Sequence, residues 1–384
     1  MALGAVLTGC AGSDGSPAVV ESDSAGVRII ESVRPAWTEG EAWRVMEVPE
    51  VRIGTPDGPE EAMLHQVEDV ARLGDGRLVV TNRGTHELRV YSTTGDFVRT
   101  VGRQGEGPGE FFAPSRTWVG PDDSLFVSAF LRFSVFDSTG TFVRSVGVEG
   151  WSPHDRFRDG TYLFVVIPRG VDRFEPGHFH PINALVRAEA DGAAADTLAH
   201  VPGSELYRFE SSAGGMASLR APFGRIRLAA TYGDSVVTAG GTDFEVQLLD
   251  ETGELVRILR REKAPDPVSD SDIAELEKGL LDSAPERTHP DRRRLFAEWS
   301  YPELKPALDR LLVDSEGNIW VRAYSVDPAG AGEWSVFDPS GRWLGTVETP
   351  PGLEVKWVDD RSIAGVRVDE LDVEYVHVHS LVKP

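Results

Sequence analysis

Basic and aromatic side chains gather in segments that join the expected strands in the first half of the chain. Guanidinium groups bind carboxylates and phosphates through paired hydrogen bonds, and aromatic rings line many small-ligand sites. If these side chains converge on one concavity, the site would suit an anionic or sugar-like ligand. Alternatively, the arginines pair with neighbouring acidic residues. The candidate ligand-binding residues are Arg83, His86, Arg103, Arg116, Trp118, Arg132 and Trp151.

Two pairs of histidines are spaced so that both imidazoles lie on one face of an extended segment. The first pair is His178 and His180, and the second is His377 and His379. Such pairs could bind zinc or another divalent metal. The competing interpretation is that they are surface or packing histidines, because no third ligand is fixed beside either pair. The sequence therefore names them as weak metal candidates and predicts no defined cofactor.

The glycine-rich loop from Gly102 to Phe112 superficially suggests a phosphate-binding loop. It lacks the lysine and the following helix that a P-loop requires, so we exclude that chemistry. We interpret it as the connection between two repeats, with Phe111 or Phe112 packed inward.

The only cysteine is Cys10, which rules out an intramolecular disulfide. Leu7-Thr-Gly-Cys10 resembles the bacterial lipobox, in which the cysteine is lipidated, although the apolar segment before it is short and has no basic residue. Small and polar residues follow, as in a flexible tether. We predict a truncated signal and tether over residues 1–26, lipidation at Cys10 and attachment to a membrane. The alternative is a chance cysteine in a flexible terminus.

The charge of the chain restricts its partners. It carries 39 Lys+Arg against 62 Asp+Glu, a formal net charge of −23. Duplex nucleic acid and anionic lipid would both be repelled, so neither is predicted as the main partner. The same charge would keep an exported protein soluble, and the alternative is that it forms an acidic face for cations or basic partners.

One strand–turn–strand unit recurs along the chain. Its fullest copy is Phe133–Gly147, in which apolar residues alternate on either side of the turn Asp137-Ser-Thr-Gly140. An aspartate here accepts hydrogen bonds from its own backbone, and glycine supplies the positive φ. Other copies place their turn glycines at Gly95, Gly253 and Gly341. Repetition at this spacing predicts a β-propeller.

Five blades can be assigned directly and a sixth must combine the two ends of the chain. Trp43–Ile53 is expected as the outer strand beside three C-terminal strands, which would close the ring and hide two sheet edges. The segment beginning at Val27 is a rival or additional closing strand. The five continuous blades are expected at Val67–Val101, Ser115–Val146, Asp155–Val201, Ile226–Leu259 and Leu311–Val347.

Two segments interrupt the repeat. Pro202–Phe223 is expected to be a connecting loop. Ala264–Arg310 has cap residues followed by apolar positions at helical spacing, which predicts a helical insertion between blades four and five. We expect its helices to lie over one mouth of the central channel.

The repeated turns, the loop Gly102–Phe111 and the strand Asp314–Val321 resemble those of bacterial six-bladed β-propeller lipoproteins, which are related to the NHL-repeat group. The resemblance covers nearly all of Val27–Val382 and implies an all-β six-bladed propeller over residues 27–384. It also implies a periplasmic, outer-membrane or cell-surface location. It does not imply one activity, because such propellers include binders, scaffolds, lyases and lactone hydrolases.

Lyases and lactonases of this kind hold a metal in the channel, with ligands from several inner strands. The corresponding candidates here do not recur at matching positions, and there is no G-x-S-x-G motif for a serine nucleophile. We therefore predict an exported binding or protein-interaction module at the cell envelope. One alternative is a metal-dependent hydrolase or lyase acting in the channel, and another is a structural envelope component. The channel candidates are His65, Asp69, His154, Asp155 and Asn183.

Overall fold

The computed structural model describes residues 18–130, 132–147, 153–167, 175–211, 214–282, 284–327 and 330–384. The expectations for Cys10 and Trp151 lie outside these residues. In the described part of the chain, no helix has the length and apolar character needed to cross a membrane.

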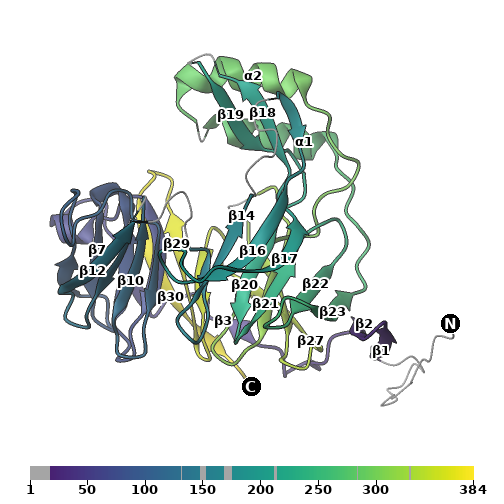
Figure 1. The fold of residues 1–384 in the computed structure, drawn as a ribbon, viewed down its shortest axis with the longest axis horizontal. Helices are drawn as coiled ribbons and strands as arrows, with labels where there is room; N and C mark the ends of the chain where they lie inside the picture. The colour runs from purple at the N-terminus through teal and green to yellow at the C-terminus, as the bar shows by residue number, and fades with distance from the viewer. Residues whose placement is uncertain are drawn as a thin grey trace.

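Most of the chain forms consecutive antiparallel sheets, each of which is one blade (Figure 1). Blade one contains β5 (Val67–Arg72), β6 (Leu78–Asn82), β7 (Glu87–Tyr91) and β8 (Phe97–Val101). Blade two contains β9 (Arg116–Val119), β10 (Leu125–Ala129), β11 (Arg132–Phe136) and β12 (Phe142–Gly147). Blade three contains β13 (Asp155–Arg156), β14 (Tyr162–Val166), β16 (Ile182–Ala188) and β17 (Asp196–Pro202). Blade five contains β24 (Leu308–Val313), β25 (Ile319–Ala323), β26 (Gly332–Phe337) and β27 (Trp343–Thr349).

Blade four is larger than predicted. Its four strands are β20 (Leu228–Tyr232), β21 (Ser235–Ala239), β22 (Glu245–Leu249) and β23 (Leu255–Arg261). The N-terminal hairpin of β1 (Val19–Ser24) and β2 (Val27–Ser32) extends it, because β2 pairs in parallel with β23. The alternative in which the segment from Val27 serves as a rival or additional closing strand is therefore wrong. Val19–Ser24, which the sequence analysis assigned to the tether, is instead a strand of this hairpin.

Blade six joins the two ends of the chain, as predicted. The C-terminal strands are β28 (Glu354–Val358), β29 (Ser362–Val368) and β30 (Glu374–Val382). The outer edge of β30 pairs with β3 (Arg44–Val45) and with β4 (Val51–Ile53), where Val51 faces Val378 and Ile53 faces Val376. The innermost strand β28 also contacts β5 of blade one, so the ring is closed.

Six clusters of buried apolar side chains fill the six interfaces between neighbouring blades. Each cluster combines one face of a blade with the opposing face of the next, which is the sheet-on-sheet packing expected of propeller blades. Taken in order around the ring, pairs from the six clusters are Val79 and Leu125, Phe133 and Tyr162, Leu163 and Val236, Leu248 and Leu311, Trp334 and Ile363, and Val376 and Val80.

The repeated turns explain why the blades can pack so closely. In the turn of blade four, the Asp250 carboxylate accepts hydrogen bonds from the backbone N–H groups of Thr252 and Glu254, at 2.9 and 3.0 Å. Gly253 has a φ of +87°, and a Cβ there would collide with the carbonyl of Leu198 on the outer strand of blade three. Gly140 has a φ of +80°, and a Cβ there would collide with the side chain of Val101 on the outer strand of blade one. The glycine therefore permits both the turn and the approach to the preceding blade.

A lobe of strands and helices stands beside blades three to five (Figure 1). It contains β15 (Gly177–Phe179), β18 (Leu206–Glu210), β19 (Met216–Arg220), α1 (Asp270–Asp282) and α2 (His289–Glu298). The helical insertion is confirmed. The prediction of a connecting loop over Pro202–Phe223 is wrong, because β18 and β19 form a hairpin whose Tyr207 packs on Trp299 after α2, with ring centroids 6.1 Å apart. The sequence analysis did not predict this hairpin, because the segments that it packs on, β15 and the residue Trp299, lie elsewhere in the chain.

Replacing Gly253 by alanine should destabilise the protein by about 3 kcal/mol or more, because left-handed strain of 1–2 kcal/mol adds to a clash with backbone. The matched control is Gly233→Ala in the same blade, where φ is +63° but nothing lies within 4 Å of the new Cβ. Urea unfolding of both variants measures the difference. Equal losses would show that the approach of blade three is not a constraint.

The closing blade should be sensitive to acid through His377. Burial, with a smaller contribution from His379, lowers the pKa of His377 to about 4, against an ordinary value near 6.5. Below pH 6.5 the unfolded chain takes up a proton that the folded chain does not, so stability should fall by about 3 kcal/mol between pH 6.5 and 4.

In His377→Phe, this part of the acid-induced loss of unfolding free energy should disappear. His178→Gln, which alters an exposed imidazole, is the control and should behave as the wild type. Chemical denaturation at pH 7 and pH 4.5 provides the comparison, and an unchanged pH dependence in His377→Phe would contradict the assignment.

Candidate ligand-binding channel

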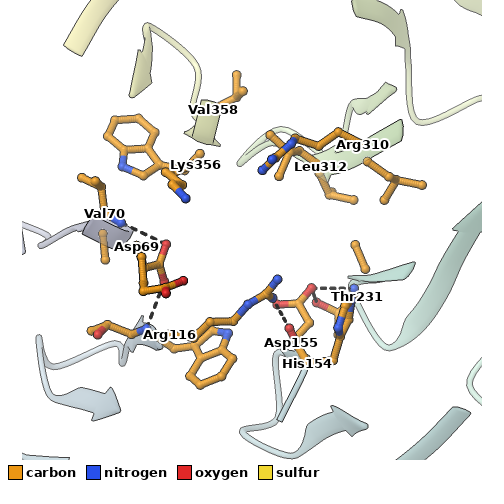
Figure 2. A pocket seen from close by; sticks show the side chains of 18 of the residues that line it. Asp69, Val70, Arg116, His154, Asp155, Thr231, Arg310, Leu312, Lys356 and Val358 are labelled. Carbon is orange, nitrogen blue, oxygen red and sulfur yellow. Dashed lines mark hydrogen bonds between the residues drawn. The ribbon is translucent and has the colours of Figure 1, made fainter. Parts of the chain in front are cut away.

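The innermost strands of all six blades surround a central cavity of about 1120 Å³. Figure 2 shows Asp69, Arg116, Arg310 and Lys356 directed from different strands towards the same space. Among the described residues, neither α1 nor α2 contributes to the lining, and their position over a mouth of the channel stays a prediction. The channel is thus a polar space built by strands from every part of the sequence.

Two carboxylates fasten the innermost strand of one blade to that of the next. Asp69 on β5 accepts a hydrogen bond from the Thr117 N–H on β9, at 3.0 Å. Asp155 on β13 accepts from both the N–H and the hydroxyl of Thr231 on β20, at 2.7 and 3.0 Å (Figure 2). These aspartates therefore act as inter-blade acceptors, a role that accounts for both without a metal.

The environment of Asp69 disfavours its charge. Burial raises its pKa, and the N–H donors Thr117 and Val70 and the nearby cations Arg116 and Lys356 only partly oppose this effect. A carboxylate in such surroundings gains from any further donor that reaches it.

Arg116 lines the channel and bonds to the backbone rather than to a carboxylate. One of its Nη atoms donates to the backbone carbonyl of His154 (Figure 2). In the part of the chain that the structure describes, no carboxylate oxygen lies within 4.0 Å of its guanidinium, and the residue is exposed to the channel. Its remaining N–H donors are therefore available to a ligand.

Other channel cations are compensated differently. Arg310 and Lys356 share the single carboxylate of Glu354, at 2.9 and 3.0 Å. Burial opposes ionisation of Glu354, but Lys356 and Arg310 outweigh it and lower its pKa. Arg227 donates to the Pro202 carbonyl, and burial, with repulsion from Arg225, lowers its pKa to about 10. Glu354 alone therefore cannot neutralise both Arg310 and Lys356, and Lys356 also lies near the Asp69 carboxylate.

His154 lies next to Arg116 but is turned into the protein. Its Nε2 lies 2.9 Å from the backbone carbonyl of Ala229, which makes Nε2 the protonated nitrogen. Burial lowers the pKa of His154, and Arg116 lowers it further. The imidazole is therefore neutral near pH 7 and adds no charge to the channel.

The structure places the predicted ligand-binding residues in different parts of the molecule. Arg116 and Trp118 line the channel, and Arg83 is linked to it through an ion pair with the channel residue Glu68 at 2.5 Å. Arg103 instead pairs with Glu110 at 2.7 Å, and Arg132 donates to the Glu106 carbonyl at 2.7 Å. Both arginines hold the loop between blades one and two. Arg103 pairs with an acidic side chain, as the alternative interpretation proposed, whereas Arg132 bonds to backbone carbonyls. His86 also lies on that side, where its ring stacks on Phe112.

The weak metal candidates are in two different places. His377 and His379 are buried on β30, and His379 Nδ1 lies 2.8 Å from the Met46 carbonyl. His178 and His180 belong to the lobe and its edge, with His180 Nδ1 3.3 Å from a Glu205 carboxylate oxygen. Among the described residues, no group of three or more His, Cys, Asp or Glu side chains is placed to hold a metal ion. His65 and Asn183 lie outside the cavity lining.

Sequence reasoning missed Arg310, Lys356 and Arg227. A signal for Arg310 was present, because aligning the blades on their first turn reveals it. Asp69, Arg116 and Arg310 each lie four residues before the residue whose N–H closes that turn, namely Leu73, Gly120 and Asp314. Lys356 could not be found in this way, because the register of its strand shifts between Val355 and Trp357.

Asp155→Ala should destabilise the protein by about 1–3 kcal/mol, because the Thr231 N–H loses its acceptor inside the channel wall. Thr231→Val is the control, since it removes the hydroxyl but keeps the N–H bond, and it should cost clearly less. Urea unfolding of the two variants distinguishes them. A loss in Asp155→Ala no larger than that in Thr231→Val would remove the fastening role.

Comparisons with known proteins agree with this architecture. A family model described as a 6-bladed beta-propeller, DUF5128, matches residues 55–144. No curated protein matches the chain.

Two solved structures are similar along their whole length. One is a Bacteroides fragilis protein that is provisionally named an exported protein. It is 11% identical, with a TM-score of 0.50, over 93% of this chain and 99% of that one. The other is a member of the DUF4221 family from Bacteroides vulgatus. It is 9% identical, with a TM-score of 0.50, over 90% of this chain and 100% of that one. The chain is thus a six-bladed β-propeller that resembles bacterial propellers of this kind in its fold.

Proposed function

We propose that this protein is an exported binding module whose central channel takes a small anionic ligand. The observation that carries the proposal is Arg116, a channel guanidinium that is bonded to a backbone carbonyl and has no carboxylate within 4.0 Å among the described residues. A guanidinium presents paired donors that match a carboxylate or phosphate. Binding of a ligand carboxylate would use donors that the protein leaves to solvent.

The rest of the channel supports the same ligand chemistry. Lys356 and Arg310, which share the Glu354 carboxylate, provide two further cations on the opposite side of the space from Arg116 (Figure 2). Asp69, whose pKa is raised by burial, is suited to accept a hydrogen bond from a ligand hydroxyl. An anion that also carries hydroxyl groups therefore fits this lining better than a simple inorganic ion.

The proposed location follows from the N-terminal residues. Lipidation of Cys10 would place the propeller at the cell envelope, with the tether joining it at the hairpin on blade four, which begins at Val19. The name of the Bacteroides fragilis relative in fold supports export. In this position the module could pass its ligand to, or share it with, an envelope protein.

The test is calorimetric titration with galacturonate as a hydroxylated carboxylate and galactose as its neutral counterpart. Galacturonate should bind and galactose should bind at least tenfold more weakly. Arg116→Gln should weaken galacturonate binding about 10-fold to 100-fold, as expected for the loss of a charge-assisted hydrogen bond. The control is Arg103→Gln, which changes an arginine whose side chain is 78% exposed and paired with Glu110 outside the channel.

Metal dependence separates this proposal from the alternative of a metal-dependent enzyme. Treatment with EDTA should leave galacturonate affinity unchanged. Equal affinities for wild type and Arg116→Gln, or a stoichiometric metal whose removal abolishes binding, would overturn the proposal.

A further inference from the structure

An exposed aromatic cluster stands on the loops at one edge of blade two. Phe112 is 54% exposed and Phe130 is 62% exposed. Their ring centroids are 6.0 Å apart, and the His86 ring stacks on Phe112 at 5.4 Å with an interplanar angle of 14°. We call these three residues the rim platform. An exposed cluster of rings forgoes the stabilisation that burial of its apolar area would give. Single exposed apolar residues are common on protein surfaces, whereas a cluster calls for an explanation.

The backbone holds the rim platform in place at a conformational cost. His86 and Ala113 both have positive φ, at +59° and +52°. The two are joined, because the Ala113 N–H donates to Nδ1 of His86 at 3.0 Å. The Phe130 N–H donates to the Phe112 carbonyl at 3.0 Å. Strain of about 1–3 kcal/mol per residue persists where the surroundings enforce it, and such positions cluster at ligand sites.

The same hydrogen bond determines what His86 can offer. Because Nδ1 accepts the Ala113 N–H, a neutral imidazole must carry its proton on Nε2. The platform therefore combines two phenyl faces, a stacked imidazole and one ring N–H donor. Neighbouring Phe111 does not contribute, since it is buried against Phe136 at 5.4 Å.

The rim platform continues directly into the channel wall. Phe112 and Phe130 extend the pairing of β9 with β10 outward, because the next pair inward is Ser115 with Ser128, joined at 2.8 Å. Ser115 and Arg116 already line the channel. Only three residues separate Phe112 from Arg116, so their Cα atoms are at most about 14 Å apart. One extended ligand can contact both.

Size and charge indicate the kind of ligand. The exposed faces of the two phenyl rings amount to roughly 200 Å², well below the area that one partner buries in a stable protein interface. The net charge of −23 disfavours extended polyanions, such as a lipid surface or nucleic acid, more than it disfavours a short ligand with few charges. A pyranose ring fits the platform, because it presents an apolar C–H face to an aromatic ring and hydroxyl groups to a donor such as Nε2–H.

We propose that the channel ligand is an acidic oligosaccharide, whose terminal uronate carboxylate binds Arg116 while a neighbouring sugar ring stacks on the rim platform. This inference rests on the proposed function, since it assumes that the channel binds a carboxylate. It adds a second subsite and a preference for chain length.

The experiment compares binding of galacturonate, trigalacturonate and neutral maltotriose to the full propeller. In the wild type, trigalacturonate should bind at least tenfold more tightly than the monomer, and maltotriose should bind more weakly than trigalacturonate. Phe112→Ala and Phe130→Ala should each reduce the gain from chain length without changing monomer affinity. Phe97→Ala is the matched control, because Phe97 is an exposed phenylalanine on β8 outside the platform.

The outcomes separate the two claims. If the monomer binds through Arg116 but trigalacturonate gains nothing, or keeps its gain in Phe112→Ala and Phe130→Ala, the rim platform is not a sugar subsite and the proposed function stands. If neither galacturonate nor trigalacturonate binds, both claims fail. If a hydrophobic peptide binds the platform and trigalacturonate does not, the surface serves protein docking and this inference is overturned.

Discussion

The pairing of β4 with β30 is the interaction on which the other features depend. It joins residues 51–53 to residues 376–378, so the first and last blades are neighbours only because the chain ends are hydrogen-bonded to each other. An open ring would leave a row of unpaired backbone groups at each end and no enclosed channel. The contact between β28 and β5 brings the channel residues of blades six and one together once this closure is made.

Packing between the blades then determines how rigidly the channel residues are held. The turn glycines allow each blade to approach the outer strand of the preceding blade, and six apolar clusters fill the interfaces. At the centre of the ring, polar contacts hold neighbouring blades together. Asp69 connects blades one and two, Arg116 connects two and three, Asp155 connects three and four, and Arg310 connects five and six. The residues that line the ligand space are therefore also part of what holds the ring together.

Charge is distributed unevenly between the surface and the channel. The protein as a whole is strongly acidic, yet two channel aspartates are occupied by backbone donors and one glutamate is shared by two cations. This leaves Arg116 as a donor group facing the space. The acidic exterior would slow the approach of an anion, so selectivity must come from the geometry inside the channel and at its rim.

The sequence by itself determined the repeated turns, the sixfold architecture, the closure through Trp43–Ile53 and the helical insertion, because these depend on local patterns that recur along the chain. It also placed Arg116 and Trp118 at the mouth of the channel, and both line the cavity. Only the tertiary structure showed that Arg103 and Arg132 hold a loop, that Lys356 and Arg310 face Arg116, and that β2 extends blade four. These facts depend on which strands become neighbours across a closed ring, and on which donors and acceptors then satisfy each other, neither of which is encoded in local spacing.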